Sequence, residues 1–214
     1  MLLEVKNLCI SYKEPLIKDL SFCLIQNQIL GIKGKNGSGK TSLCLALAGI
    51  LDEAFIQGEI NIQGEDILDM PISERCQNIG IVFQRPEEQI FSPIVEDEIV
   101  FGMENLRFER NVMQDRLSEV LNLLGISKLR KQKTNSLSLG QKQLVAIASV
   151  LVMEPKILIA DEISSPLDED NKKLVRKVLK DYANDGRGVI VVSHSKEDLE
   201  ICDKIIELGG QDED

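Results

Sequence analysis

The sequence lacks tryptophan, has a single histidine, and contains no pair of cysteines in the Cys-x-x-Cys spacing. Its five cysteines are scattered through apolar segments: Cys9, Cys23, Cys44, Cys76 and Cys202. Cysteines of this kind are expected to be small buried hydrophobes in a reducing compartment. They therefore predict neither a metal site nor a redox centre.

Long apolar runs are also missing, because no stretch approaches the roughly 18 to 20 residues needed to cross a bilayer. Residues 1–10 alternate Glu4 and Lys6 with apolar neighbours and lack the basic start and apolar stretch of a secretory signal. We therefore expect a chain that stays in the cytosol and reaches a membrane only through a partner.

Positive charge is scarce: 25 lysines and arginines face 35 acidic residues, a net charge of −10. This balance disfavours a surface that binds nucleic acid by neutralising phosphates, so no direct nucleic-acid contact is predicted. At 214 residues the chain suits one domain, with subdomains, that buries its core without disulfides.

The pattern of short apolar runs predicts an α/β fold. Four strand-like runs come first and indicate a small antiparallel layer: 2–9, 20–25, 29–33 and 59–63. The third also leads through a glycine-rich loop into an apolar helix at 42–51, which begins a parallel core. Helical periodicity fills the region from about 86 to 153, in three segments: 95–103, 111–124 and 139–153.

Strands then alternate with a helix: 157–160, the amphipathic helix 169–184, 188–192 and 204–208. The prediction is one unit, 1–214, with a parallel-sheet core of the P-loop type, an N-terminal antiparallel β subdomain and an inserted helical subdomain at about 86–153. The acidic end, 211–214, is expected to be frayed.

The strongest motif is a glycine-rich loop that fits G-x-x-x-x-G-K-[ST] between a strand and a helix. Its backbone N–H groups and the following helix N-terminus suit phosphates, while Lys40 can reach the β- and γ-phosphates and Thr41 can ligate Mg²⁺. The predicted nucleotide-binding residues here are Gly34, Lys35, Asn36, Gly37, Ser38, Gly39, Lys40, Thr41 and Ser42. An ordinary turn before a helix is the alternative, and the other motifs argue against it. A dinucleotide fold is disfavoured because G-x-G-x-x-G is absent. The ligand is ATP or GTP.

An acid pair follows the apolar strand 157–160 and is predicted to lie at the carboxyl edge of the sheet. Asp161 is expected to hold Mg²⁺ through water, and Glu162 to orient and deprotonate the attacking water. Isolated acid pairs often cap a turn, but beside a phosphate loop the hydrolytic role is favoured.

The segment Leu137-Ser138-Leu139-Gly140-Gln141 resembles the L-S-G-G-Q signature of ATP-binding cassettes. Three further features agree in order and spacing with that family over nearly the whole chain: Gln84 after the strand 79–83, the turn 165–168, which is similar to S-A-L-D, and His194 after the strand 189–193.

This resemblance implies roles for several residues. Tyr12 would stack on adenine, Gln84 would contact Mg²⁺ and the attacking water, and His194 would contact the γ-phosphate. Ser138 is also a good N-cap for the helix that follows. In the family this helix start faces the nucleotide of a second cassette, so ATP joins two cassettes. The nucleotide-binding residues implied on this surface are Ser138, Gly140, Gln141 and Asp168.

Residues 82–102 resemble the energy-coupling factor group of these ATPases, which serves uptake of vitamins and of cobalt or nickel. The resemblance implies a second ATPase subunit, alike or different, a transmembrane coupling protein and a substrate-capture membrane protein, with this chain on the cytoplasmic face of the membrane. Departures from the family pattern at Leu139, Leu144, Ile163 and Pro166 predict unequal sites in the pair.

Two other functions are possible for a chain with a phosphate loop. A soluble cassette acting on ribosomes or nucleic acid usually has two cassettes in one chain, a coiled-coil insertion or a basic arm. A small-molecule kinase would lack the signature.

Five acidic side chains beside Gln84 predict a docking surface for arginine-bearing helices of the coupling protein: Glu87, Glu88, Glu96, Asp97 and Glu98.

Overall fold

The computed structural model describes residues 1–52 and 54–209. The acidic end expected to be frayed, 211–214, lies outside the described residues. Across the described ranges, each helix is too short or too polar to span a bilayer.

An antiparallel sheet of four strands forms the N-terminal layer, in the order β2-β1-β4-β5. Its strands are β1 (Leu3–Ser11), β2 (Pro15–Leu24), β4 (Phe55–Ile62) and β5 (Glu65–Asp66). In β1, alternate side chains are buried, so that one face packs on the core. The strands β2 and β4 begin several residues earlier than the apolar runs 20–25 and 59–63 predicted, because pairing with β1 extends both.

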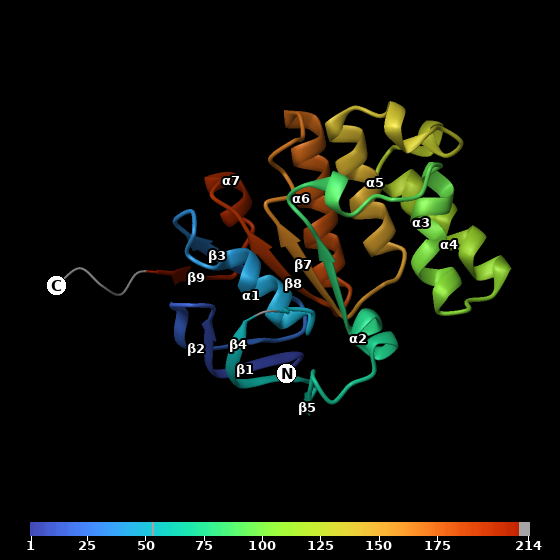
Figure 1. Cartoon of the computed structure of the whole chain (residues 1–214). Coiled ribbons are helices and arrows are strands. Elements are labelled where there is room, and N and C mark those ends of the chain that lie inside the picture. The colour runs from blue at the N-terminus through green and yellow to red at the C-terminus, as the bar shows by residue number, and fades with distance from the viewer. Residues whose placement is uncertain (53, 210–214) are drawn as a thin grey trace.

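A parallel sheet of five strands forms the centre of the molecule, in the order β6-β7-β8-β3-β9 (Figure 1). Its strands are β3 (Gln28–Gly34), β6 (Ile79–Val82), β7 (Ile157–Asp161), β8 (Gly188–Val192) and β9 (Lys204–Leu208). The run 29–33, predicted within the antiparallel layer and at the start of the parallel core, pairs only with β8 and β9. It therefore belongs to the parallel sheet alone.

Both faces of the parallel sheet are buried, which is why β7 and β8 read as continuous apolar runs. Because successive side chains point to opposite faces, Leu158 and Ala160 join one core with the helices. Ile157 and Ile159 join the other, with helix α1 (Lys40–Leu47) and the antiparallel sheet.

The segment between β6 and β7 is helical, and its helices group beyond one face of the sheet (Figure 1). It contains α3 (Val95–Asn105), α4 (Arg110–Leu123), α5 (Leu139–Leu151) and the short turns η1 (Pro86–Glu88), η2 (Ser127–Leu129) and η3 (Thr134–Ser136). The remaining helices are α2 (Ile72–Asn78), α6 (Glu169–Asn184) and α7 (Lys196–Leu199). The predicted fold class, a parallel core with an antiparallel β layer and inserted helices, is confirmed.

Helix α1 (Lys40–Leu47) begins and ends earlier than the predicted segment 42–51. Gly49 adopts a left-handed φ of 67°. Its N–H donates to the carbonyl of Ala46 at 2.9 Å, and the N–H of Ile50 donates to Leu45 at 3.0 Å. This pair of bonds closes the last turn, and it ends the helix because a left-handed residue cannot continue it.

Candidate nucleotide-binding site

The predicted site residues from four strands meet at one edge of the parallel sheet. Parallel strands all end at the same edge, and ligands of such sheets bind there. The loop after β3 supplies Lys40, β7 ends in Asp161 and Glu162, β6 leads to Gln84 and β8 leads to His194. A single hollow is lined by residues of this set together with Leu16: Asn36, Gly37, Gly39, Lys40, Thr41, Ser42, Gln84, Glu162 and His194.

The phosphate loop turns sharply at two left-handed glycines, Gly37 with φ 80° and Gly39 with φ 92°. Gly34 is needed for space, since a Cβ there would lie 2.5 Å from Ser38 Oγ. Lys40 Nζ donates to the carbonyls of Gly34 at 2.9 Å and Lys35 at 3.2 Å. The glycines and this lysine therefore fold the loop into a cradle around an ammonium group that is 8% exposed.

The donors of this loop fit an anionic phosphate chain. The first N–H groups of a helix have no intrahelical acceptor. In α1 the N-cap is Gly39, which has no side chain to accept from them. Within the described residues, Ser38 Oγ is buried and has no hydrogen-bond partner. Unpaired donors at a helix N-terminus are a ready anion site.

Thr41 and Asp161 are 120 residues apart in sequence, and Thr41 Oγ1 donates to Asp161 Oδ2 at 3.0 Å. Burial raises the pKa of the Asp161 carboxyl above its ordinary value, and the Thr41 hydrogen bond partly offsets this. A hydroxyl, a carboxylate and the nearby amide of Gln84 are hard oxygen ligands, the type that Mg²⁺ prefers. These residues fit the predicted cation.

Glu162 is the centre of the site. Its Oε1 lies 3.0 Å from His194 Nε2 and 3.8 Å from Lys40 Nζ, and its Oε2 accepts from Gln84 Nε2 at 3.0 Å. Its backbone is left-handed, with φ 49°, a strained conformation for a residue with a side chain. The structure thus brings all three predicted catalytic residues into contact.

Two residues of the N-terminal layer border the phosphate loop. The hydroxyl of Tyr12 lies 3.2 Å from Ser42 Oγ, and the residue is 48% exposed, so that part of this aromatic residue stays open to solvent beside α1. Leu16 of β2 lines the hollow itself. Leu16 was not predicted as a site residue, because one apolar residue in a strand carries no signal of a site.

The signature residues are placed elsewhere, outside the residues that line this hollow. Ser138 is the N-cap of α5, as predicted: its Oγ accepts from Gln141 N at 3.3 Å and its N–H donates to Gln141 Oε1 at 3.0 Å. Gly140 lies in the first turn of the same helix, and Asp168 caps α6 by accepting from Asn171 N at 2.8 Å. This chain alone therefore forms one half of the predicted arrangement.

The loop that carries Gln84 is anchored by two glutamines that the sequence did not predict to be part of the site. The Oε1 of Gln89 accepts from the N–H of Phe83 at 3.1 Å. The fully buried Gln143 donates to the carbonyl of Phe83 at 3.2 Å. Their positions, 6 and 60 residues away, gave no local signal. Together they fix the backbone next to Gln84.

The structure corrects the predicted acidic docking surface only at the buried Glu98, and docking at the other acids stays a prediction. Glu87 pairs with Lys142 at 2.6 Å, and Glu96 pairs with Lys131 and, at 2.9 Å, with Arg130. These cations hold the pKa of both carboxyls below their usual range. Glu98 is 3% exposed and accepts from the N–H groups of Phe91 and Ser92 at 3.1 and 2.7 Å. Its charge orders a loop and does not face a partner.

Comparison with known proteins agrees with this site. The model of the family described as ABC transporter matches residues 17–165. Energy-coupling factor transporter ATP-binding protein EcfA1 of Mycoplasma pneumoniae is 39% identical over 197 residues, 92% of this chain and 71% of that protein. EcfA1 of Fusobacterium nucleatum is 38% identical, over 92% of this chain and 75% of that protein.

Solved structures agree as well. The structure of cbiO1 from Clostridium perfringens, described as part of the ABC transporter complex cbiONQ, matches with a TM-score of 0.84 at 32% identity. The match covers 97% of this chain and 84% of that one. An ATP-binding cassette solved as a dimer with ADP and Pi, 24% identical, has the same fold with a TM-score of 0.87.

A phosphate loop, an acid pair and a separate signature helix on one parallel sheet define an ATP-binding-cassette ATPase, which binds and hydrolyses ATP. The chain belongs to the ABC transporter family and, within it, to the ATP-binding proteins of energy-coupling factor transporters. Family membership excludes the small-molecule kinase considered above.

Proposed function

We propose that this chain hydrolyses ATP at the edge formed by the phosphate loop, Asp161, Glu162, Gln84 and His194, as the motor of an energy-coupling factor importer. The observation that carries the proposal is the convergence on Glu162 of Gln84, His194 and Lys40, three residues from three separate segments. A carboxylate held from several sides beside a phosphate cradle is positioned to act on a water that attacks a γ-phosphate.

Each residue has a distinct part in this proposal. The backbone N–H groups of the loop bind the phosphates, and Lys40 neutralises charge on the β- and γ-phosphate oxygens. Glu162 accepts the proton of the attacking water, while Gln84 and His194 orient that water and the γ-phosphate. Thr41, Asp161 and Gln84 would hold Mg²⁺, which supplies positive charge to the phosphate oxygens. Tyr12 offers its exposed ring to the adenine.

The site is completed by a second cassette in this proposal. Ser138, Gly140, Gln141 and Asp168 face outward and bind the nucleotide held by that subunit. We further propose that residues 1–214 form one nucleotide-binding domain whose helical subdomain, about 86–153, contacts a transmembrane coupling protein joined to a substrate-capture protein. The chain would then lie on the cytoplasmic face of the membrane, moving a vitamin or a transition-metal ion.

Exchange of Glu162 for glutamine tests the role of the base. Glu162→Gln keeps the shape of the side chain but cannot accept the proton, so hydrolysis by the assembled complex should fall about 100- to 10,000-fold. ATP affinity, measured by titration, should stay near that of the wild type. Lys40→Ala should instead lose ATP affinity, because it removes a cation from the cradle. Unchanged turnover of Glu162→Gln would remove Glu162 from its role.

A further inference from the structure

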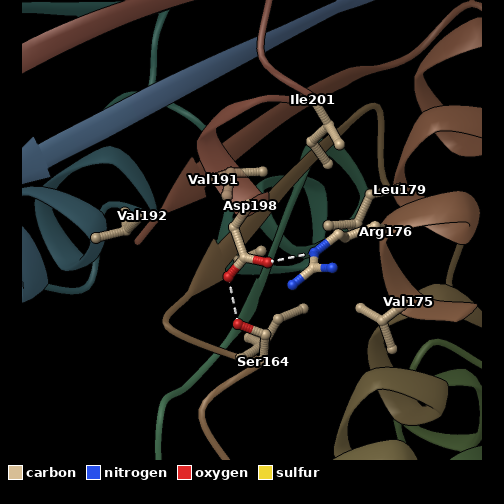
Figure 2. Close-up of a pocket in the computed structure, with 10 residues that line it drawn as sticks. Ser164, Val175, Arg176, Leu179, Val191, Val192, Asp198 and Ile201 are labelled. Atoms are coloured by element: carbon tan, nitrogen blue, oxygen red, sulfur yellow. Dashed lines mark hydrogen bonds and ion pairs between the residues drawn. The ribbon is translucent and has the colours of Figure 1, made fainter. Parts of the chain in front are cut away.

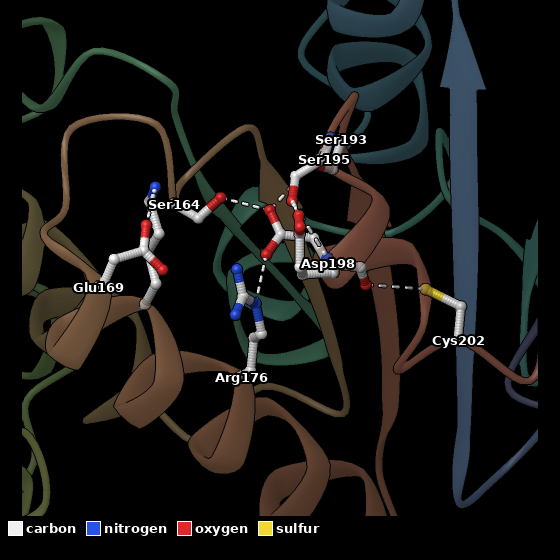
Figure 3. Close-up of polar contacts among 9 residues, drawn as sticks. Ser164, Glu169, Arg176, Ser193, Ser195, Asp198 and Cys202 are labelled. Carbon is white, nitrogen blue, oxygen red and sulfur yellow. Dashed lines mark hydrogen bonds and ion pairs between the residues drawn. The ribbon is translucent and has the colours of Figure 1, made fainter.

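Asp198 is a buried acid outside the nucleotide site. It lies in α7 and is 5% exposed. Its carboxylate joins three segments of the chain, and Figure 2 shows it between Ser164 and Arg176. Oδ1 accepts from Arg176 Nε of α6 at 2.7 Å, while Oδ2 accepts from Ser193 Oγ at 2.9 Å and from Ser164 Oγ. The same group of contacts is drawn from another side in Figure 3.

Two of these three segments carry predicted catalytic residues. Ser193 directly precedes His194, and its Oγ also accepts from the N–H of Ser195 at 3.0 Å. Ser164 follows Glu162 by two residues, in a turn where the N–H of Ser165 donates to the carbonyl of Glu162 at 3.1 Å. Each serine is thus tied to its catalytic neighbour by one or two residues of backbone.

Polar contacts add to apolar packing in holding these segments to α6. A small cavity lies beside the Asp198 carboxylate and is lined by Val175, Leu179, Val191 and Ile201 (Figure 2). The apolar side chains therefore leave space at this point. The backbone of α7 is tied as well, because Cys202 Sγ donates to the carbonyl of Asp198 at 3.6 Å (Figure 3).

The chemistry of this cluster suits a fixed junction. A buried carboxylate is stable only when it is paired and hydrogen-bonded, and Arg176 and the two serines provide both conditions. Hydrogen bonds to a charged acceptor are stronger and more directional than neutral ones. Movement of either serine would leave part of the carboxylate unpaired.

We propose that Asp198 is a positioning residue that sets the distance between Glu162 and His194. One carboxylate oxygen holds the segments of both residues. It thereby supports the 3.0 Å contact between Glu162 Oε1 and His194 Nε2, beside the backbone bond from Glu162 N to the carbonyl of Val192 at 2.9 Å. The same junction orients the turn that leads from Ser164 to Asp168. This inference rests on the proposed function, in which Glu162 and His194 act on the same γ-phosphate.

A double-mutant cycle tests this coupling. Ser164→Ala detaches the Glu162 segment and Ser193→Ala detaches the His194 segment, while each leaves Asp198 paired with Arg176. In the assembled complex, each should lower kcat about 10- to 100-fold, the range for a small misplacement of reacting groups, with ATP affinity within about 2-fold. The kcat of the double variant should be no lower than that of the less active single variant, because either change breaks the same link. Losses that multiply would overturn the proposal.

A second readout does not depend on catalysis. His194 is the only histidine, so its ring gives one resolvable set of NMR signals in the isolated chain. Ser164→Ala, 30 residues away in sequence, should shift those signals through Asp198. Ser149→Ala, a matched loss of a serine whose Oγ bonds within α5, should not. Unmoved His194 signals in Ser164→Ala would overturn the proposal.

These tests separate the inference from the function on which it rests. If Glu162→Gln hydrolyses ATP normally, the proposed role of Glu162 fails. The NMR signals of His194 in Ser164→Ala still test whether Asp198 couples the two segments. If Asp198→Asn folds, it should reproduce the signal shift of Ser164→Ala, because one amide oxygen cannot accept from three donors. The serine variants decide the question if it does not fold.

Discussion

At the scale of single residues, the site holds groups that are costly to the fold. Glu162 adopts a left-handed backbone, and Asp161 is an acid that is only 3% exposed. Strained conformations and buried charges gather at functional sites because function, and not stability, requires them there. The free energy of unfolding should therefore rise when a buried charge such as that of Asp161 is replaced by a neutral side chain.

Asp161 allows a direct test of this cost. Burial raises its pKa in the folded chain, so the folded state binds the proton more tightly than the unfolded state does. The free energy of unfolding then falls as pH rises from the ordinary aspartate value, about 3.9, through the raised one. Without nucleotide at pH 7, Asp161→Asn should melt above the wild type, and each 1 kcal/mol gained should raise Tm by about 2–4 °C.

The gain should shrink as pH is lowered through that window, since a protonated Asp161 is already neutral. Thermal melts at several pH values measure it, with Asp69→Asn as the control because Asp69 is exposed. A gain in Tm that is absent at pH 7, or is the same at every pH, would show that the Asp161 charge does not destabilise the fold.

At the scale of elements, the N-terminus of α5 combines two tasks. The reciprocal bonds between Ser138 and Gln141 satisfy its first donors, and this is sufficient to explain both residues structurally. The same helix end is exposed, with Leu139 at 50%, and carries the positive end of the helix dipole toward solvent. Capping and binding of a partner's phosphate can be separated by substitution.

Two replacements of Ser138 separate these tasks. Ser138→Ala removes the cap and should lower the free energy of unfolding by about 0.5–2 kcal/mol. Ser138→Asp keeps a good cap, so stability should be retained, but its charge would repel the γ-phosphate of the second cassette. Hydrolysis by the paired complex should therefore fall in both. Ser118→Ala, in the exposed part of α4, is the control. Full activity of a stable Ser138→Asp chain would assign Ser138 to capping alone.

At the scale of the whole molecule, the two halves of the predicted site lie on separate surfaces. The residues that line the phosphate hollow include none of Ser138, Gly140, Gln141 and Asp168. We expect a nucleotide bound in the hollow to meet such residues from another subunit. The arrangement makes ATP a link between two cassettes, because each bound phosphate chain would then contact both.

Association should consequently depend on ATP. The isolated chain should hydrolyse ATP slowly and gain activity with a second cassette and the coupling protein. Glu162→Gln, which should bind ATP without consuming it, should increase in mass by light scattering when ATP and Mg²⁺ are added, alone or with the second cassette. Lys40→Ala should not respond. Full activity from a strictly monomeric species would contradict this arrangement.

The sequence by itself determined the features that depend on a few neighbouring residues. The glycines of the phosphate loop, the cap at Ser138 and the buried strand before Asp161 follow from local backbone geometry and periodicity. A known family order then joined these motifs into one fold. Even the end of α1 at Leu47, just before the left-handed Gly49, is a local effect, although the helix was predicted to run further.

Only the tertiary structure decided which side chains meet across long separations. Glu87 and Glu96 find cations 55 and 34 or 35 residues away, so acids expected to await a partner are paired within the chain. Asp198 joins Ser164, 34 residues distant, to the segment of His194. The partner of a charged side chain depends on how strands and helices pack. The residues next to it in the sequence do not reveal that packing. The acidic run alone therefore could not reveal that Glu98 is buried and that Glu87 and Glu96 pair within the chain, and the docking surface itself stays a prediction.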